Sequence, residues 1–454
     1  MKEINFEVRP DYVLREWPRI EKYQNSTLRY TPPKDFPAYW VKMNQSRPKI
    51  IRTWVTLDEI WDIDTDRYNW NYQIGVDTKG DRRYYPYDWP STRPSETLFE
   101  DYLTSYCDMA EEAMLNIRRF ERETADGILS YEKYEEVAEK VIEHCRMLCS
   151  NIVYIEVSNE SEIRGFGRIT VPEYMKLYDC ICRAVARLNT KHRWNLKVGG
   201  TAMTDSAGVM VGLWHEYMKA LAGDECPDKR IDFYSFHAYD TDTYRLQQMY
   251  NIHRADLKKY DLPDVPLFFD EYGVRNCNEE PIENLMNASG TLKGMMRTAD
   301  FENFHIFPWC TFHNPGYQMS YTQYIRLPEG GYAPTANGLS VKVLCGMLKD
   351  EIAVVGDTDY RVRASAEGKK MYLILTNPDG EEAVFNAKFR QPEGSKLHVE
   401  IRQVDEKLNN AVMNPPCMEL QVTEKKDAEI IDGEANVSLT LPRFGFASMT
   451  VTVE

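Results

Sequence analysis

The sequence predicts an α/β fold, a (β/α)₈ TIM barrel followed by a C-terminal antiparallel β-sandwich. Short apolar runs alternate with long helical patterns between about residues 49 and 349, which is typical of parallel strands joined by crossover helices. From about residue 351 the pattern changes to short alternating segments separated by turn residues, with no helix of useful length. That second pattern favours a small sandwich.

The barrel prediction rests on seven segments that read as buried strands and on helical patterns between them. The strand segments are residues 49–55, 114–119, 152–158, 196–201, 231–237, 265–271 and 304–311. Apolar residues recur at helical spacing over residues 98–106, 134–142 and 175–185. An eighth strand is needed to close a barrel, and residues 26–30 are the best candidate before residue 49.

The second domain is predicted from alternating segments and turns. The segments include residues 361–364, 370–376, 383–389 and 435–441, and Asn377-Pro378-Asp379-Gly380 marks a turn. We therefore expect a barrel domain over residues 20–350 and a sandwich over residues 351–454. Residues 1–19 either add a strand to this sandwich, since residues 3–9 alternate, or form an N-terminal arm.

Composition excludes several classes of partner. The chain has 454 residues, of which 55 are basic and 71 acidic, and the net charge of −16 disfavours nucleic acids and anionic membranes as partners. No apolar run approaches the roughly 18 residues that a membrane helix needs. The ten cysteines include no CxxC pair, so buried free thiols in a reducing, cytoplasmic compartment are expected. A secreted or periplasmic location would require a leader removed before residue 1.

Two glutamates stand at the ends of predicted strands, where a barrel places its active site. Glu160 follows the fourth strand in an Asn159-Glu160 pair, and Glu271 ends the seventh. Either one alone is best explained as a solvated rim residue or an ion-pair partner. Two facing carboxyl groups are what glycosidic bond cleavage requires, because one protonates the departing oxygen while the other attacks or activates water.

The pattern resembles the retaining glycoside hydrolases of clan A, and most closely glycoside hydrolase family 39, the family of β-xylosidases and α-iduronidases. In that clan an Asn-Glu pair ends the fourth strand and a nucleophilic Glu ends the seventh. Further similar segments, over roughly residues 49–350, are Ile51-Arg52-Thr53-Trp54, Lys197-Val198-Gly199-Gly200-Thr201-Ala202 and Asp232-Phe233-Tyr234-Ser235-Phe236-His237-Ala238-Tyr239.

The resemblance implies roles for individual residues. Glu160 would be the acid/base, Glu271 the nucleophile and Asn159 a hydrogen-bond partner of the sugar 2-hydroxyl, while Arg52 would be a cation that keeps Glu271 ionised. The remaining residues implied in sugar binding are His237, Tyr239, Trp54, Trp309 and Phe312. For the aromatic pair Trp309 and Phe312, stacking on a sugar and packing at the barrel mouth are equally good explanations.

The sequence also departs from the family pattern at two positions. Ser161 follows Glu160 where the family usually has Pro, so the leaving-group site differs. Trp54 stands where the family usually has a His two residues after the Arg, so an aromatic face replaces one polar contact to the sugar. The sugar therefore need not be xylose.

We therefore expect a retaining glycoside hydrolase acting on an oligosaccharide or glycoside, in the manner of a β-xylosidase-like exo-enzyme, without a cofactor. Two alternatives are a non-catalytic carbohydrate-binding barrel and a metal-dependent barrel isomerase or lyase. The second would need a His-rich set at the strand ends, whereas the chain has only 8 His. No metal is expected, since no His accompanies the Asp62, Asp64 and Asp66 cluster. The linkage and the oligomeric state do not follow from the sequence.

Overall fold

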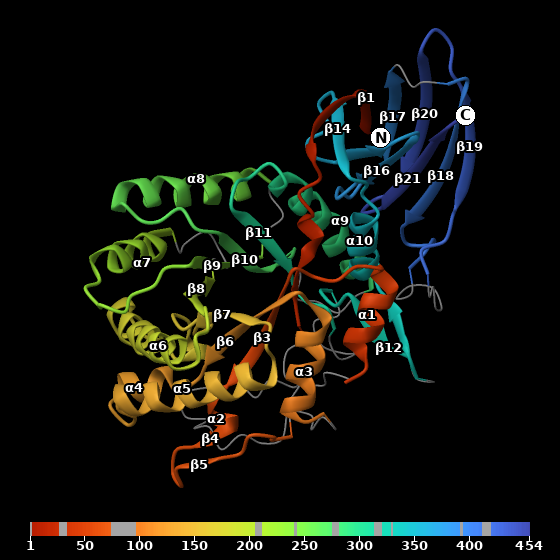
Figure 1. Ribbon diagram of the computed structural model, residues 1–454. Helices are drawn as coiled ribbons and strands as arrows, with labels where there is room; N and C mark the ends of the chain where they lie inside the picture. The colour runs from red at the N-terminus through yellow and green to blue at the C-terminus, as the bar shows by residue number, and fades with distance from the viewer. Residues whose placement is uncertain are drawn as a thin grey trace.

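The computed structural model of the chain describes residues 2–26, 34–73, 97–204, 211–239, 243–274, 281–312, 320–327, 330–390, 394–410 and 419–454. Within these residues the chain forms two domains, a barrel and a large curved sheet (Figure 1). Among the described helices, none is long and apolar enough to cross a membrane.

Eight parallel strands form the barrel that the sequence predicts. In chain order they are β2 (Tyr23–Asn25), β3 (Ile50–Thr56), β6 (Glu112–Arg118), β7 (Ile152–Val157), β8 (Lys197–Thr204), β9 (Phe233–Ala238), β10 (Leu267–Tyr272) and β11 (Phe304–Pro308). The first and last strands lie side by side: the backbone nitrogen of Thr311 donates to the carbonyl of Asn25 at 3.3 Å, and the rings of Tyr23 and His305 stack 4.1 Å apart. The barrel is therefore nearly closed.

Eight longer helices follow the barrel strands. They are α1 (Phe36–Asn44), α3 (Phe99–Met109), α5 (Tyr131–Leu148), α6 (Val171–His192), α7 (Val211–Gly223), α8 (Thr243–Tyr260), α9 (Pro281–Thr298) and α10 (Ala336–Cys345). Shorter elements in the connections are η1 (Ile20–Lys22), α2 (Leu57–Ile60), α4 (Glu121–Ala125), η2 (Arg164–Phe166) and the pairs β4 (Trp61–Asp62) with β5 (Arg67–Tyr68) and β12 (Tyr324–Arg326) with β13 (Tyr332–Pro334).

The first barrel strand is the one misplaced strand prediction. Expected at residues 26–30, it is β2 at Tyr23–Asn25; Ser26 follows the strand, and residues 27–30 lie outside the described part of the chain. A strand of three residues gives too little alternation for a periodic signal, and the apolar Ile20 that precedes it belongs to a 3₁₀ turn.

The barrel interior is built in layers, because alternate residues of each strand point inward. An apolar layer consists of Tyr23, Ile50, Met114, Tyr154, Phe233, Phe268 and Phe307. Two residues further along the same strands, towards their C-terminal ends, stand Asn25, Arg52, Asn116, Glu156, Ser235, Asp270 and Trp309. The apolar layer therefore forms the floor on which a buried, mostly polar layer rests.

The second domain is one nine-stranded sheet that curves back on itself. Its order is β19 (Glu424–Glu429), β18 (Lys396–Val404), β21 (Phe446–Val453), β16 (Lys370–Thr376), β15 (Val362–Glu367), β14 (Asp350–Val355), β1 (Lys2–Glu16), β17 (Ala383–Arg390) and β20 (Glu434–Leu441). The two edge strands meet where Lys426 donates to the carbonyl of Ser438 at 2.8 Å, and apolar side chains fill the space between the layers. This is the predicted C-terminal sandwich.

The N-terminal strand β1 lies among the strands of the C-terminal domain, as the red strand beside blue strands in Figure 1 shows. It pairs in antiparallel fashion with β14 and in parallel fashion with β17. The domain packs on helix α9 of the barrel: Arg363 donates to the carbonyl of Met296 at 2.7 Å, and Thr376 donates to the carbonyl of Ser289 at 2.9 Å. Both ends of the described chain thus belong to one domain.

Strand β8 has a glycine, Gly199, at a point where it lies very close to strand β9. A Cβ added there would lie 2.4 Å from the carbonyl oxygen of Phe233, a distance that real Cβ atoms do not show. Close approach of β8 to β9 therefore requires glycine at this position.

We expect Gly199→Ala to lower the free energy of unfolding by about 1–3 kcal/mol, as overpacking of a core does. The matched control is Gly223→Ala at the end of α7, where a Cβ would meet nothing within 4 Å; it should change stability by less than about 1 kcal/mol. Urea unfolding of both variants measures the difference. Equal effects would contradict the packing argument.

Candidate active site

An extra residue in strand β10 turns two consecutive acids into the barrel. Phe269 pairs with Phe236 and Glu271 with His237, so Asp270 has no counterpart on strand β9. Successive residues of a regular strand point to opposite faces, and a bulge of this kind redirects one of them. The amide of Asn25 fixes the bulge by donating to the carbonyl of Asp270 at 2.5 Å.

Glu160 lies three residues beyond strand β7, on a turn that folds it back over the strand ends. Ser158 and Glu160 both have left-handed backbone angles, with φ of 63° and 47°, each of which costs about 1–3 kcal/mol in a residue other than glycine. Two hydrogen bonds hold the turn: Asn116 donates to the carbonyl of Ser158 at 2.6 Å, and the Glu160 nitrogen donates to the carbonyl of Ala202 at 2.8 Å.

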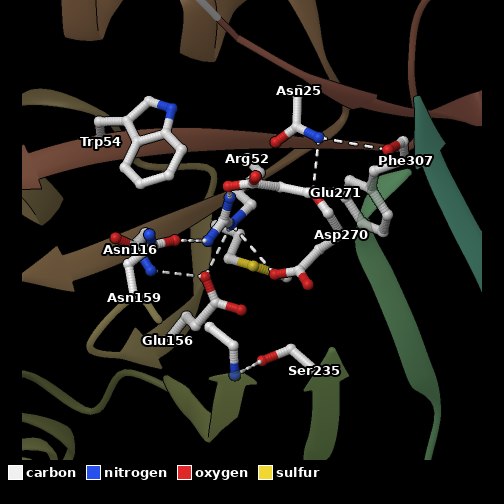
Figure 2. A network of polar contacts seen from close by, with 12 residues as sticks. Asn25, Arg52, Trp54, Asn116, Glu156, Asn159, Ser235, Asp270, Glu271 and Phe307 are labelled. Carbon is white, nitrogen blue, oxygen red and sulfur yellow. Dashed lines mark hydrogen bonds and ion pairs between the residues drawn. The ribbon is translucent and has the colours of Figure 1, made fainter. Parts of the chain in front are cut away.

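The guanidinium of Arg52 connects these elements, as Figure 2 shows. Its Nε donates to Oε2 of Glu156 at 2.7 Å, and its Nη1 donates to Oε1 of Glu271 at 2.9 Å. Its Nη2 donates to Oδ1 of Asn159 at 2.8 Å. Arg52 is 0% exposed, so these contacts take the place of water around the charge.

The two predicted glutamates meet in one cluster with His237. One carboxylate oxygen of Glu160, one of Glu271 and a ring nitrogen of His237 all lie within 4.8 Å of one another. Nδ1 of His237 is 2.7 Å from Oε1 of Glu160, and the hydroxyl of Tyr239 donates to Oε2 of Glu271 at 2.5 Å. Residues 111 positions apart in sequence thus face each other.

The two glutamates have different electrostatic surroundings. Glu271 is ion-paired with Arg52 and accepts from Tyr239. Burial raises the pKa of Glu160 to about 7, which the charges of Arg52 and Arg118 only partly oppose. Burial also lowers the pKa of His237 to about 4, so the imidazole facing Glu160 is neutral at neutral pH. Glu160 is thus suited to hold a proton, whereas Glu271 faces a cation and a hydrogen-bond donor.

An aromatic cluster lies next to these acids. It consists of Trp54, Trp309 and Tyr321, with Tyr239 packed against it. The Trp54 ring has the guanidinium carbons of Arg52 at 4.4 Å and Arg118 at 4.5 Å from its centroid. Trp54 and Trp309 meet edge to face at 5.9 Å.

Phe312 is the predicted site residue that the structure does not bring into this cluster. Its ring packs 5.1 Å from that of Phe36 and 5.9 Å from that of Tyr332, and it is 1% exposed. It belongs to the hydrophobic core between the barrel and its surrounding helices. Strand β11 ends at Pro308, and Phe312 lies three positions after Trp309, an odd spacing that would place it on the opposite face even in a continued strand.

Several residues of the site carried no role in the sequence-based prediction. They are Asn25, Asn116, Arg118, Glu156, Asp270 and Tyr321. The signal that could have found Glu156 and Asp270 is a charged residue inside an otherwise apolar strand, two positions after an inward-facing aromatic residue. A buried charge needs a partner, and Arg52 on another strand was the available one.

Glu160, His237 and Glu271 are also a ligand set of the kind that holds a divalent cation. Both oxygens of Glu271 already have partners, one in Arg52 and the other in Tyr239. A cation at this position would have to displace the Arg52 contact or lie beside its positive charge. The hydrogen-bond pattern therefore fits a pair of acids better than a metal centre.

We expect Arg52→Met to lower the free energy of unfolding by roughly 3–5 kcal/mol, because it leaves buried carboxylates without their cation. The control is Arg187→Met, since Arg187 pairs with Glu135 and Glu139 but its side chain is 48% exposed; the expected loss is about 0–1 kcal/mol. Chemical unfolding at neutral pH measures both. A loss for Arg52→Met no larger than the control would refute the central role of this ion pair.

No protein-family model and no curated protein matches the sequence. Solved structures do match it along its whole length. The chain is 13% identical to the GH39 enzyme from Xanthomonas axonopodis pv. citri, with a TM-score of 0.70 and coverage of 100% of this chain and 98% of that one. For a β-xylosidase from Caulobacter crescentus CB15 the identity is 14%, the TM-score 0.70 and the coverage 99% of both chains. For a glucosidase from Croceicoccus marinus the identity is 14%, the TM-score is 0.67 and the coverage is 100% of both chains. The fold is therefore that of these glycoside hydrolases, including the sheet domain after the barrel.

Proposed function

We propose that the chain is a retaining glycoside hydrolase that cleaves an O-glycosidic bond by double displacement. The observation that carries this proposal is the approach of the Glu160 and Glu271 carboxylate oxygens to within 4.8 Å. Retaining enzymes hold their two carboxyl groups about 5–5.5 Å apart, whereas inverting enzymes need about 6.5–9.5 Å to admit a water molecule. The likeness in fold to glycoside hydrolases gives independent support.

In the first half-reaction Glu271 attacks the anomeric carbon while Glu160 protonates the departing oxygen. Hydrogen bonds from Arg52 and Tyr239 hold the two oxygens of Glu271 in position for attack. Since Oδ1 of Asn159 accepts from Arg52, its amide NH₂ is the group that would donate to the sugar 2-hydroxyl. The neutral ring of His237 orients Glu160.

In the second half-reaction Glu160 takes a proton from water, which attacks the glycosyl-enzyme and releases the sugar with its original anomeric configuration. Esterification of Glu271 removes a negative charge from the cluster, so ionised Glu160 becomes more favourable at the moment when a base is required. One residue thereby serves as acid and then as base.

For the substrate, we propose a β-xylosidase-like exo-action. Its support is the likeness to the β-xylosidase from Caulobacter crescentus CB15. Because the likeness to a glucosidase is nearly as high, the identity of the sugar needs a direct test. A panel of aryl β-xylosides, β-glucosides and α-L-iduronides identifies the preferred sugar. Binding of sugars without any turnover would point to a carbohydrate-binding protein instead, and activity lost to a chelator and restored by a divalent cation would point to metal-dependent chemistry.

The pKa of about 7 for Glu160 predicts the pH profile. Below this value Glu160 is protonated and can act as the acid, and above it the proton is lost, so kcat/KM should fall as pH rises through about 7. A pH series with a poor leaving group measures this limb. The fall of kcat/KM with pH should be smaller for a dinitrophenyl glycoside, because dinitrophenolate departs without help from an acid. A profile flat to high pH for both substrates would contradict Glu160 as the acid.

Substitution separates the roles of the two glutamates. Glu160→Ala should lose about 10²–10⁴-fold with poor leaving groups, keep glycosylation by dinitrophenyl glycosides, and be rescued by azide with retained configuration. Glu271→Ala should lose at least about 10⁴-fold with every substrate. Steady-state rates and NMR of the azide adduct test both.

The matched control is Glu162→Gln, because burial raises the pKa of Glu162 to about 8 and it lies two residues from Glu160. This variant should keep the acid-dependent rate. If Glu162→Gln instead showed azide rescue, the acid would be Glu162. If Glu271→Ala were rescued with a retained product, the two roles would have to be exchanged.

A further inference from the structure

We propose that Glu156 and Asp270 share a single proton beneath the two outer glutamates, so that the pair presents one negative charge to Arg52. Both act as positioning residues, since neither reaches the reacting atoms. This positioning role rests on the proposed function, whereas the shared proton follows from the structure of the buried layer alone.

The contact between the two acids requires a proton. Glu156 and Asp270 are each 0% exposed, and both approach Nε of Arg52, at 2.7 Å and 3.1 Å. Oε2 of Glu156 and Oδ2 of Asp270 therefore converge on the same N–H. Ionised carboxylates only accept hydrogen bonds, so two adjacent ones repel each other unless one of them carries a hydrogen that it can donate.

The distribution of donors places this proton on Asp270. Glu156 accepts from Arg52 and from Asn116, each at 2.7 Å. Within the described residues no donor is aligned on either oxygen of Asp270. Burial accordingly raises the pKa of Asp270 well above its usual range, whereas Arg52 and the surrounding hydrogen bonds lower that of Glu156 despite its burial.

The count of charges leads to the same assignment. The groups that face Asp270 are Glu156 from β7, Arg52 from β3, His237 from β9 and Glu271 of its own strand. Three ionised carboxylates around one guanidinium would leave two uncompensated negative charges in a closed core, at a cost of several kcal/mol per ion. With Asp270 protonated and His237 neutral, the excess is one charge, which the polar donors of the layer surround.

The shared proton also bears on Glu160. Its acid strength depends on the charges near it, which are those of Arg52, Arg118, Glu271 and Glu162, and on the neutral groups His237 and Tyr239. The pair of Glu156 and Asp270 affects the acid strength of Glu160 indirectly, because its negative charge partly cancels the positive charge of Arg52. Removing the negative charge of the pair should therefore make Glu160 a stronger acid.

Infrared difference spectroscopy of the wild-type protein tests the proton directly. The measurement is made at about pH 9, one unit above the pKa of about 8 for Glu162, so that Glu160 and Glu162 are ionised. A carbonyl stretch of a protonated carboxyl group should remain and should shift in protein labelled with ¹³C-aspartate. Its absence, or its failure to shift with the label, would overturn the assignment to Asp270 without requiring any variant to fold.

Asp270→Asn and Glu156→Gln should each remove this band, the first because the protonated group is gone and the second because Asp270 then ionises beside Arg52. The matched control is Glu351→Gln, a buried glutamate paired with Arg15 and Arg363, which should leave the band in place. A band that persists in Asp270→Asn would overturn the proposal.

The basic limb of the kcat/KM profile provides the second readout. Each single variant keeps one negative charge in the pair, so the apparent pKa of the basic limb should stay within about 0.3 units of the wild-type value. The double variant has no negative charge in the pair, so it should lower that apparent pKa by roughly one unit. If both acids were ionised, each single variant would lower the limb and the shifts would add. An absence of turnover would refute the proposed function and leave the infrared result intact, and a missing band in an active enzyme would refute the pair alone.

Discussion

The site depends on one constraint, the burial of the Arg52 guanidinium at the centre of the barrel. Water is excluded there, so every N–H of the charge needs an acceptor and the charge itself needs anions. The acceptors come from three different places: Glu156 on β7, Glu271 on β10 and Asn159 on the turn after β7. The contacts that one buried arginine needs therefore fix the relative positions of the residues to which we assign the chemistry.

The layered interior explains how a strand pattern delivers this arrangement. The aromatic floor that includes Tyr154 and Phe268 fills the barrel, and the next inward position on each strand, Glu156 and Asp270, meets Arg52. Regular alternation would then turn Glu271 outward. The extra residue in β10 turns it inward beside His237, so that a local irregularity of one residue places the nucleophile of the proposed reaction.

The sequence predicted what depends on local pattern. Alternation and segment length predict the barrel, the sandwich and the strand ends near Glu160 and Glu271, because apolar runs mark buried strands. Strand β2 was predicted at the wrong residues because a strand of three residues is too short to show an alternating pattern. Phe312 and the pair Glu156 and Asp270 depend on which strands become neighbours and on a bulge, and neither is encoded in the spacing of one segment.

The two outer glutamates show how a fold gives different chemistry to the same residue type. Both are buried, so the properties of each depend on the polar partners that the fold supplies. Glu271 receives an ion pair from Arg52 and a hydrogen bond from Tyr239, whereas Glu160 has the neutral His237 ring as its close partner. The left-handed turn after β7 carries Glu160 to the His237 ring, while strand β10 carries Glu271 to the guanidinium of Arg52. The difference between the proposed acid and the proposed nucleophile thus originates in backbone geometry, which decides the partner that each carboxyl group meets.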